Sequence, residues 1–171
     1  MSRELLLLRH AKSDWSIDVG DFERPLNKRG KKEAQIMGEW MRRQGLTPDW
    51  IVCSPARRAL KTSEKICKAM EVKTDAIHFH DFMYQSDVKT LIKALADCPP
   101  HSERVLLIGH NPELEALLIY LADAIEQPED GKLLATATLA RLRMPDDWAD
   151  LHRHCAELVS IVRAASLKEG Q

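Results

Sequence analysis

The sequence predicts an α/β fold, a three-layer α/β/α sandwich around a mixed, mostly parallel central sheet. Short apolar runs alternate with amphipathic helical patterns along most of the chain. The first run, residues 5–8, is four leucines in a row, which suits a strand that is covered on both faces. Because 171 residues can bury a sizeable core, we expect a single domain spanning residues 1–171.

The first helix is expected after a loop. Residues 14–26 show no periodicity and contain several acidic side chains, which predicts a loop. Asn27 then offers a helix cap, apolar residues follow at helical spacing, and Gly45 offers a stop. Residues 48–55 predict a turn, a short buried strand and the start of a second helix, with Ser54 as its cap and Pro55 at its first position.

The second half of the chain repeats this order. Residues 77–82 predict a short strand, and Ser86 is the expected cap of the helix that follows. Residues 104–112 predict a buried strand and then a helix, with Asn111 as its cap and Pro112 at its first position.

The C-terminal part is expected to add two more strands. Residues 126–132 predict a polar loop. Residues 133–144 and 156–167 alternate well enough for strands, which antiparallel pairing would suit, and a short helix is expected between them near Trp148.

Composition narrows the function classes. Lys plus Arg number 25 against 26 Asp plus Glu, so no general affinity for polyanions and no nucleic-acid partner are expected. The four cysteines lack CxxC spacing, and the apolar run near the start is too short for a signal or membrane segment. We therefore expect a cytoplasmic protein that works without a membrane. No cofactor or metal is expected, since the HRHC stretch at 152–155 lacks a matching second half.

Basic or imidazole side chains follow three of the predicted strands. Arg9 and His10 end the first strand, Arg58 follows the second strand beside Arg57, and His110 follows the strand that begins at residue 104. Turns that lead from a strand into a helix favour anions, because free N–H groups and the helix dipole point at them. Arginine matches two phosphate oxygens at once. The pattern predicts a site for a phosphoryl group.

The chemistry indicated is phosphoryl transfer without a metal. The sequence has neither a Walker loop nor a carboxylate cluster suited to Mg²⁺. Two histidines can instead supply covalent catalysis, in which one imidazole attacks phosphorus and the resulting phosphohistidine is then hydrolysed. The arginines and the second imidazole would spread the charge of the transition state.

Four motifs, in order and spacing, resemble the histidine phosphatase superfamily, whose members share an RHG-type opening. They are RHA at 9–11, RPLNKRG at 24–30, SPARRALKT at 54–62 and GHNP at 109–112. The short chain and the GHNP motif resemble the SixA-type phosphohistidine phosphatase branch, as do residues 83–95 and 138–148. The resemblance implies a phosphoglycerate mutase-like fold and a phosphatase activity.

The resemblance also implies roles for individual residues. It makes His10 the nucleophile, Arg9 and Arg58 phosphate ligands and His110 the second pocket imidazole, with Arg24 as a further substrate-binding residue. Arg58 and Thr62 match the arginine and threonine of the family pattern and would share one helix face.

Two positions depart from the family pattern, and the second bears on the substrate. Ala11 replaces the common glycine, and Asn111 stands where relatives that cleave alkyl phosphates supply a carboxylic acid. Imidazole leaves more easily than an alkoxide, so a missing proton donor indicates phosphohistidine in a protein as the substrate. The sequence leaves open whether a carboxylate stands near the site, and the candidates are Asp14, Asp81 and Glu113.

Two other functions remain open from the sequence. One is a general phosphatase for small phosphate esters of sugars or nucleotides. The other is a non-catalytic module that binds phosphate or phosphoproteins, although such a module would not need both His10 and His110. If His10 is the nucleophile it must be neutral, and we expect the nearby arginines to lower its pKa.

Overall fold

In the computed structural model, which describes residues 3–123 and 125–167, six strands form one sheet in the order β3-β2-β4-β1-β5-β6. The strands are β1 (Arg3–Arg9), β2 (Trp50–Cys53), β3 (Ile77–Phe79), β4 (Arg104–Gly109), β5 (Thr138–Met144) and β6 (Glu157–Arg163). The strands from β3 to β1 pair in parallel, whereas β5 is antiparallel to both of its neighbours. The predicted mixed, mostly parallel sheet is confirmed.

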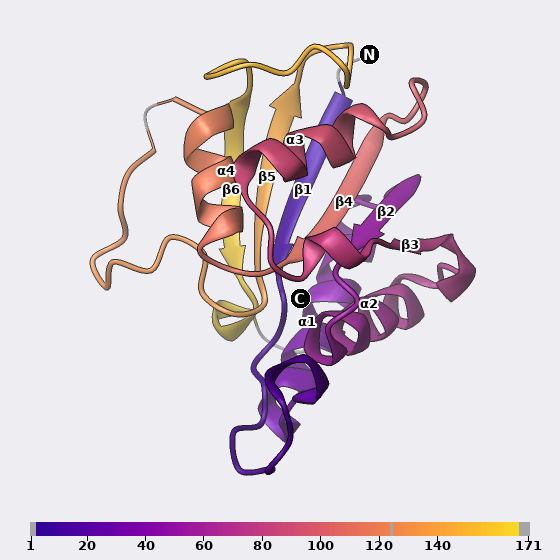
Figure 1. Cartoon of the computed structure of the whole chain (residues 1–171), viewed down its shortest axis with the longest axis vertical. Coiled ribbons are helices and arrows are strands. Elements are labelled where there is room, and N and C mark those ends of the chain that lie inside the picture. Colours follow the sequence, from indigo (N-terminus) through magenta and orange to yellow (C-terminus); the bar gives the residue numbers. More distant parts are fainter. Residues whose placement is uncertain (1–2, 124, 168–171) are drawn as a thin grey trace.

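Helices cover both faces of this sheet. One core cluster contains the inward side chains of α1 (Lys28–Arg43) and α2 (Arg57–Met70), and a second contains those of α3 (Val88–Ala96) and α4 (Glu113–Leu121). In Figure 1, α3 crosses in front of the sheet, α4 runs beside β6, and α1 and α2 lie together at the lower right. The three-layer α/β/α architecture is therefore confirmed.

The leucine run of β1 packs into both core clusters. Leu5 and Leu7 belong to the cluster under α3 and α4, and Leu6 and Leu8 belong to the cluster under α1 and α2. All four side chains are fully buried. Because successive strand residues point to opposite faces, a strand in the middle layer needs apolar residues at every position. β1 lies between β4 and β5, and so its carboxyl end is at the centre of the sheet edge.

The helix starts were predicted with mixed success. Asn27 caps α1 as expected, since its side chain accepts a hydrogen bond from the amide of Gly30 at 2.7 Å. The cap of α3 is Asp87, not Ser86, and it accepts from the amide of Thr90 at 2.8 Å. Both serine and aspartate are good caps, and the carboxylate is the one that reaches the free amide.

Two other predicted starts were wrong. α2 begins at Arg57 with Ala56 at its cap, so that Ser54 and Pro55 lie before the helix. α4 begins at Glu113, and Pro112 occupies the cap position that we expected of Asn111. In both cases the polar side chain is engaged elsewhere, because Ser54 contacts His110 and the Asn111 amide donates to the carbonyl of Leu134 at 2.8 Å.

Two further elements differ from the predictions. The strand expected over residues 77–82 ends at Phe79, and the 3₁₀ turn Asp81–Met83 follows it. No helix forms near Trp148 in the described chain, where residues 145–156 make turns. The Trp148 side chain is buried and donates to the carbonyl of Ser102 at 2.7 Å, which explains its place in the core without a helix.

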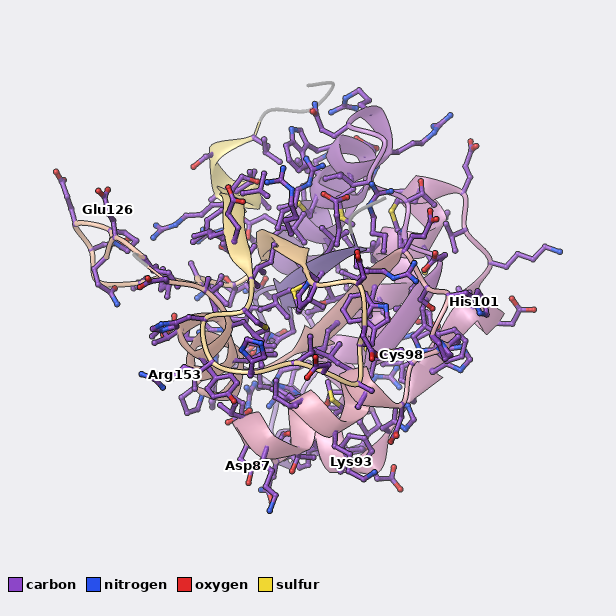
Figure 2. All side chains as sticks on the ribbon, turned by 90° about the horizontal axis from the view of Figure 1, so that it is seen from above. Asp87, Lys93, Cys98, His101, Glu126 and Arg153 are labelled. Carbon is purple, nitrogen blue, oxygen red and sulfur yellow. The ribbon has the colours of Figure 1, made fainter. Side chains whose placement is uncertain are left out.

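Two loops stand out from the body of the molecule. The loop over residues 14–26, which contains the 3₁₀ turn Asp21–Glu23, projects below the carboxyl end of β1 in Figure 1. The predicted polar loop over residues 126–132 extends away from the sheet, with Glu126 near its outer end in Figure 2. Within residues 3–123 and 125–167, no helix has both the length and the apolar character needed to span a bilayer.

Candidate active site

The register of β1 and β4 brings two histidines together. Arg9 and Gly109 are paired positions of these parallel strands, and the amide of His10 continues the ladder by donating to the carbonyl of Gly109 at 3.1 Å. The next residue of each strand is a histidine, and the ring centroids of His10 and His110 lie 5.1 Å apart. Both rings are buried at the edge where parallel strands place ligands.

A backbone carbonyl fixes the orientation of His10. Its Nδ1 atom lies 2.7 Å from the carbonyl oxygen of Ala11. Because a carbonyl oxygen only accepts, Nδ1 carries the proton, and in the neutral ring Nε2 then carries the lone pair. The amide of Ala11 donates in turn to Thr62 Oγ1 at 2.9 Å, and the Thr62 hydroxyl donates to the carbonyl of Arg58 at 2.7 Å. Thr62 thereby ties the His10 turn to α2.

His110 is held from its other side. Its Nε2 atom lies 2.7 Å from Ser54 Oγ. The same Ser54 oxygen accepts a hydrogen bond from the amide of Ala56 at 3.2 Å. The Nδ1 atom of His110 is buried and has no hydrogen-bond partner among the described residues. If the Ser54 hydroxyl donates to Nε2, the neutral ring carries its proton on Nδ1, where it can be donated to an oxyanion.

Burial keeps both imidazoles neutral. It lowers the pKa of His10 to about 3, with smaller contributions in the same direction from His110, Arg58 and Arg9, while the bond to Ala11 opposes the shift. Burial likewise lowers the pKa of His110 to about 4, followed by repulsion from Arg58. The expected direction for His10 is confirmed, but the expected cause was incomplete, because desolvation exceeds the effect of the arginines.

Three arginines and both histidines line one pocket of about 230 Å³. Its lining residues are Arg9, His10, Lys12, Ser13, Trp15, Arg24, Arg58, His110, Asn111 and Thr136. The structure thus brings together all five residues that the sequence indicated as site residues. Arg57 is exposed and does not line the pocket, whereas Arg58 is buried and does, which agrees with the choice of Arg58 for the site.

A carboxylate that the sequence did not indicate holds two of these arginines. Asp21 accepts hydrogen bonds from the side chains of Arg24 and Arg58 and from the hydroxyl of Tyr84, and its carbonyl accepts from Arg58 at 2.7 Å. The bond from Tyr84 is the main cause that lowers the pKa of Asp21, and the two arginines add to it. A carboxyl group with a lowered pKa is ionised at neutral pH and cannot donate a proton there.

None of the three carboxylates left open by the sequence lines the pocket. Asp14 accepts from the amide and hydroxyl of Ser16, and neither Asp81 nor Glu113 is among the lining residues. Asn111, at the position of the acid in some relatives, binds the carbonyl of Leu134 and the side chain of Glu115. Within the described chain, the pocket is therefore lined by cationic and neutral groups.

Sequence reasoning missed the supporting residues Asp21, Ser54 and Tyr84. Of the supporting residues, only Thr62 could be predicted from the sequence. It lies four residues after Arg58, and this spacing places both residues on one helix face. Ser54 looked like a helix cap, and Asp21 lies in a loop without periodicity. Their partners come from other elements, which local patterns do not report.

Comparison with known proteins identifies the family of this chain. Residues 5–80 match the model of the histidine phosphatase superfamily, branch 1. An uncharacterized protein of Mycobacterium tuberculosis is 32% identical over 158 residues, covering 89% of this chain and 96% of its relative. The chain belongs to the histidine phosphatase superfamily and is a phosphatase.

Solved structures narrow the class further. A protein assigned as the phosphohistidine phosphatase SixA of Nakamurella multipartitia superimposes with a TM-score of 0.80 at 28% identity, over 95% of this chain and 96% of that chain. One assigned to SixA of Agrobacterium tumefaciens gives 0.76 at 27%, over 95% and 98%. Within the superfamily, the chain is of the SixA type, with a phosphoglycerate mutase-like fold.

Proposed function

We propose that this protein removes the phosphoryl group from phosphohistidine in a partner protein, through a covalent phosphohistidine formed on His10 and without a metal. The observation that carries the proposal is the 2.7 Å contact between His10 Nδ1 and the Ala11 carbonyl, which leaves the lone pair on Nε2 of a buried, neutral ring that lines the pocket. The SixA-type relatives support the choice of substrate.

The first step transfers the phosphoryl group. Nε2 of His10 attacks phosphorus and the new P–N bond forms. The bond between phosphorus and the substrate imidazole, which carries a proton on its other ring nitrogen, breaks with the electron pair going to that ring, so that a neutral imidazole leaves. Arg9, Arg58 and Arg24 bind the phosphoryl oxygens, whose charge they match with forked donors. The Nδ1–H of His110 donates to a developing oxyanion.

The second step releases phosphate. A water oxygen attacks phosphorus, the P–N bond to His10 breaks, and His10 Nε2 recovers its lone pair, while the proton of the water passes to the phosphate product. The pocket lining contains no described carboxylate that could protonate an alkoxide leaving group. A substrate whose imidazole leaves readily therefore fits this pocket better than an alkyl phosphate does.

The rim of the pocket suits a protein partner. Large apolar side chains are exposed along the loop over residues 14–26, at 75% for Trp15, 45% each for Ile17 and Val19 and 38% for Phe22. Trp15 also lines the pocket. Apolar side chains gathered next to a reactive site are typical of surfaces that bind proteins. We further propose a cytoplasmic location, where the four free cysteines stay reduced.

The test combines trapping with a substrate panel. The wild-type protein, given a ³²P-labelled phosphohistidine peptide and quenched rapidly, is expected to retain an acid-labile, base-stable label, and His10→Ala is expected to retain none. Turnover of the phosphohistidine peptide should exceed that of phenyl, sugar and nucleotide phosphates. Label on His10→Ala, or faster turnover of the esters, would refute the mechanism or the substrate assignment respectively.

A further inference from the structure

A second pocket opens beside the phosphate pocket. It encloses about 430 Å³ and is lined by residues of β1, α1, the turn before β5 and the end of β6. Arg9, Lys12 and Thr136 line both pockets. The two pockets are therefore neighbours, and a molecule whose phosphoryl group occupies the first pocket can extend along the protein surface toward the second.

The lining of this second pocket is strongly cationic. Its charged residues are Arg9, Lys12, Arg29, Lys132 and Arg163 against one carboxylate, that of Asp130. The chain as a whole has 25 basic and 26 acidic residues, so this excess of positive charge is local. A concave surface lined by one sign of charge concentrates the opposite charge next to it.

The single carboxylate is already neutralised. Asp130 accepts two hydrogen bonds from the Arg163 guanidinium, at 2.7 and 3.0 Å, and a third from the amide of Lys132 at 3.0 Å. The same guanidinium donates to the carbonyl of Lys132 at 2.6 Å. These bonds fix the wall of the pocket and leave its remaining cations to set the local charge.

The remaining cations are available to a ligand. The ammonium groups of Lys12 and Lys132 form no salt bridge with a carboxylate in residues 3–123 and 125–167. Arg29 shares only its Nε with Glu33, at 3.2 Å, and its side chain is 61% exposed. The buried Nε of Arg9 has no partner among the described residues either.

We infer that this second pocket binds a second anionic group of the substrate, a carboxylate or a phosphate, while the scissile phosphoryl group occupies the first pocket. This inference rests on the proposed function, because it places the transferred phosphoryl group beside His10. In a phosphoprotein the second group is an Asp or Glu side chain near the phosphohistidine. In a small phosphate ester it is a second phosphate or a carboxylate.

Non-hydrolysable probes separate this inference from catalysis. Calorimetry would compare phenylphosphonate with its 3-carboxy, 4-carboxy and 4-carboxymethyl derivatives at low salt. We expect at least one carboxylated probe to bind about three- to fivefold more tightly to the wild-type protein, a gain in the upper part of the range that exposed ion pairs supply. Higher salt should remove this preference, because exposed charges are screened.

Lys132 provides the decisive variant, because it lines the second pocket only. We expect Lys132→Gln to reduce the preference for the carboxylated probe and Lys132→Glu to abolish it. Lys93→Glu is the matched control and should preserve the preference, since Lys93 lies on α3 and points into solvent in Figure 2. If no carboxylated probe binds more tightly, or if the preference survives in Lys132→Glu, the inference is wrong.

Turnover then distinguishes the two sources of the second anion. A phosphohistidine peptide with Asp neighbours is compared with its Asn version, and propane-1,3-diol bisphosphate with propyl phosphate. A preference for the acidic peptide identifies a protein substrate, and a preference for the bisphosphate identifies a small molecule. If the probes bind as expected but His10 never becomes phosphorylated, the pocket assignment stands and the proposed function fails.

Discussion

His10 and His110 lie side by side, with ring centroids 5.1 Å apart, because the residues before them are register partners in β1 and β4. Both imidazoles therefore share one buried space with three arginines. A proton on either ring would be poorly solvated there and would repel the neighbouring cations. The geometry of two parallel strands thus sets the protonation state of the site.

The first prediction concerns pH. The pKa of His10 is lowered to about 3 and that of His110 to about 4, whereas a histidine in the unfolded chain titrates near 6.5. Imidazole NMR signals of these two residues, assigned with His10→Ala and His110→Ala, should stay unshifted from pH 7 to pH 5. Midpoints near pH 6.5 would contradict the burial that the structure gives them.

The same shifts predict how stability changes with pH. Below pH 6.5 the unfolded chain takes up protons at these two positions and the folded chain does not, so their contribution to the free energy of unfolding falls as the pH drops toward 4. Urea unfolding of His10→Ala should show a weaker loss of stability between pH 6.5 and pH 4 than the wild-type protein. An identical loss in both proteins would exclude this contribution of His10.

The second prediction concerns Asp21, which holds Arg24 and Arg58 in place. In Asp21→Asn, the charge-assisted bonds are lost and both guanidiniums gain freedom, so we expect kcat/KM for the phosphohistidine peptide to fall about tenfold or more. Glu23→Gln is the control, since it changes an exposed carboxylate of the same 3₁₀ turn. A variant with undiminished kcat/KM would show that Asp21 does not position the arginines.

The third prediction concerns the Thr62 hydroxyl, which accepts from the amide of Ala11 and donates to the carbonyl of Arg58. In Thr62→Val the Ala11 amide is left buried without its acceptor, and we expect the free energy of unfolding to fall by about 1–3 kcal/mol. Chemical denaturation would measure this change. Thr62→Ser keeps the hydroxyl and should recover most of the stability; equal losses in the two variants would point to packing instead.

The fourth prediction concerns the close approach of α1 to the His10 turn. A Cβ atom on Gly30 would lie 2.1 Å from the carbonyl oxygen of Lys12, which already accepts from the amide of Asn27 at 3.0 Å. Gly30→Ala must displace this backbone, and we expect a loss of about 1–3 kcal/mol, measured by thermal unfolding. Gly20→Ala, where a Cβ meets nothing within 4 Å, should leave the melting temperature nearly unchanged.

The sequence predicted the parts of this protein that local patterns determine. The leucine run of β1 indicated a strand buried on both faces, and the strand ends indicated where Arg9, His10, Arg58 and His110 meet. In parallel sheets the carboxyl ends share one edge, so residues that follow separate strands converge without any further information.

The parts that it missed depend on contacts between distant residues. Serine is a common helix-cap residue, and the sequence therefore suggested Ser54 as the cap of α2. The register of β2 and β4 instead places the Ser54 hydroxyl next to His110, and α2 starts later. Asp21 lies in a loop whose sequence shows only surface charge, and its role arises from Arg24, Arg58 and Tyr84 around it. Such partners are fixed by tertiary structure and leave no periodic signal.

The position of β1 between two neighbours has a consequence for how the enzyme loses activity. Leu6 and Leu8 are bonded into ladders with β4 and β5 at the same time, and no local fraying can release them. His10, the proposed nucleophile, comes directly after β1 in the sequence, and the amide protons of β1 should exchange slowest with solvent. Loss of the His10 position in heat or denaturant should therefore coincide with cooperative loss of the whole sheet.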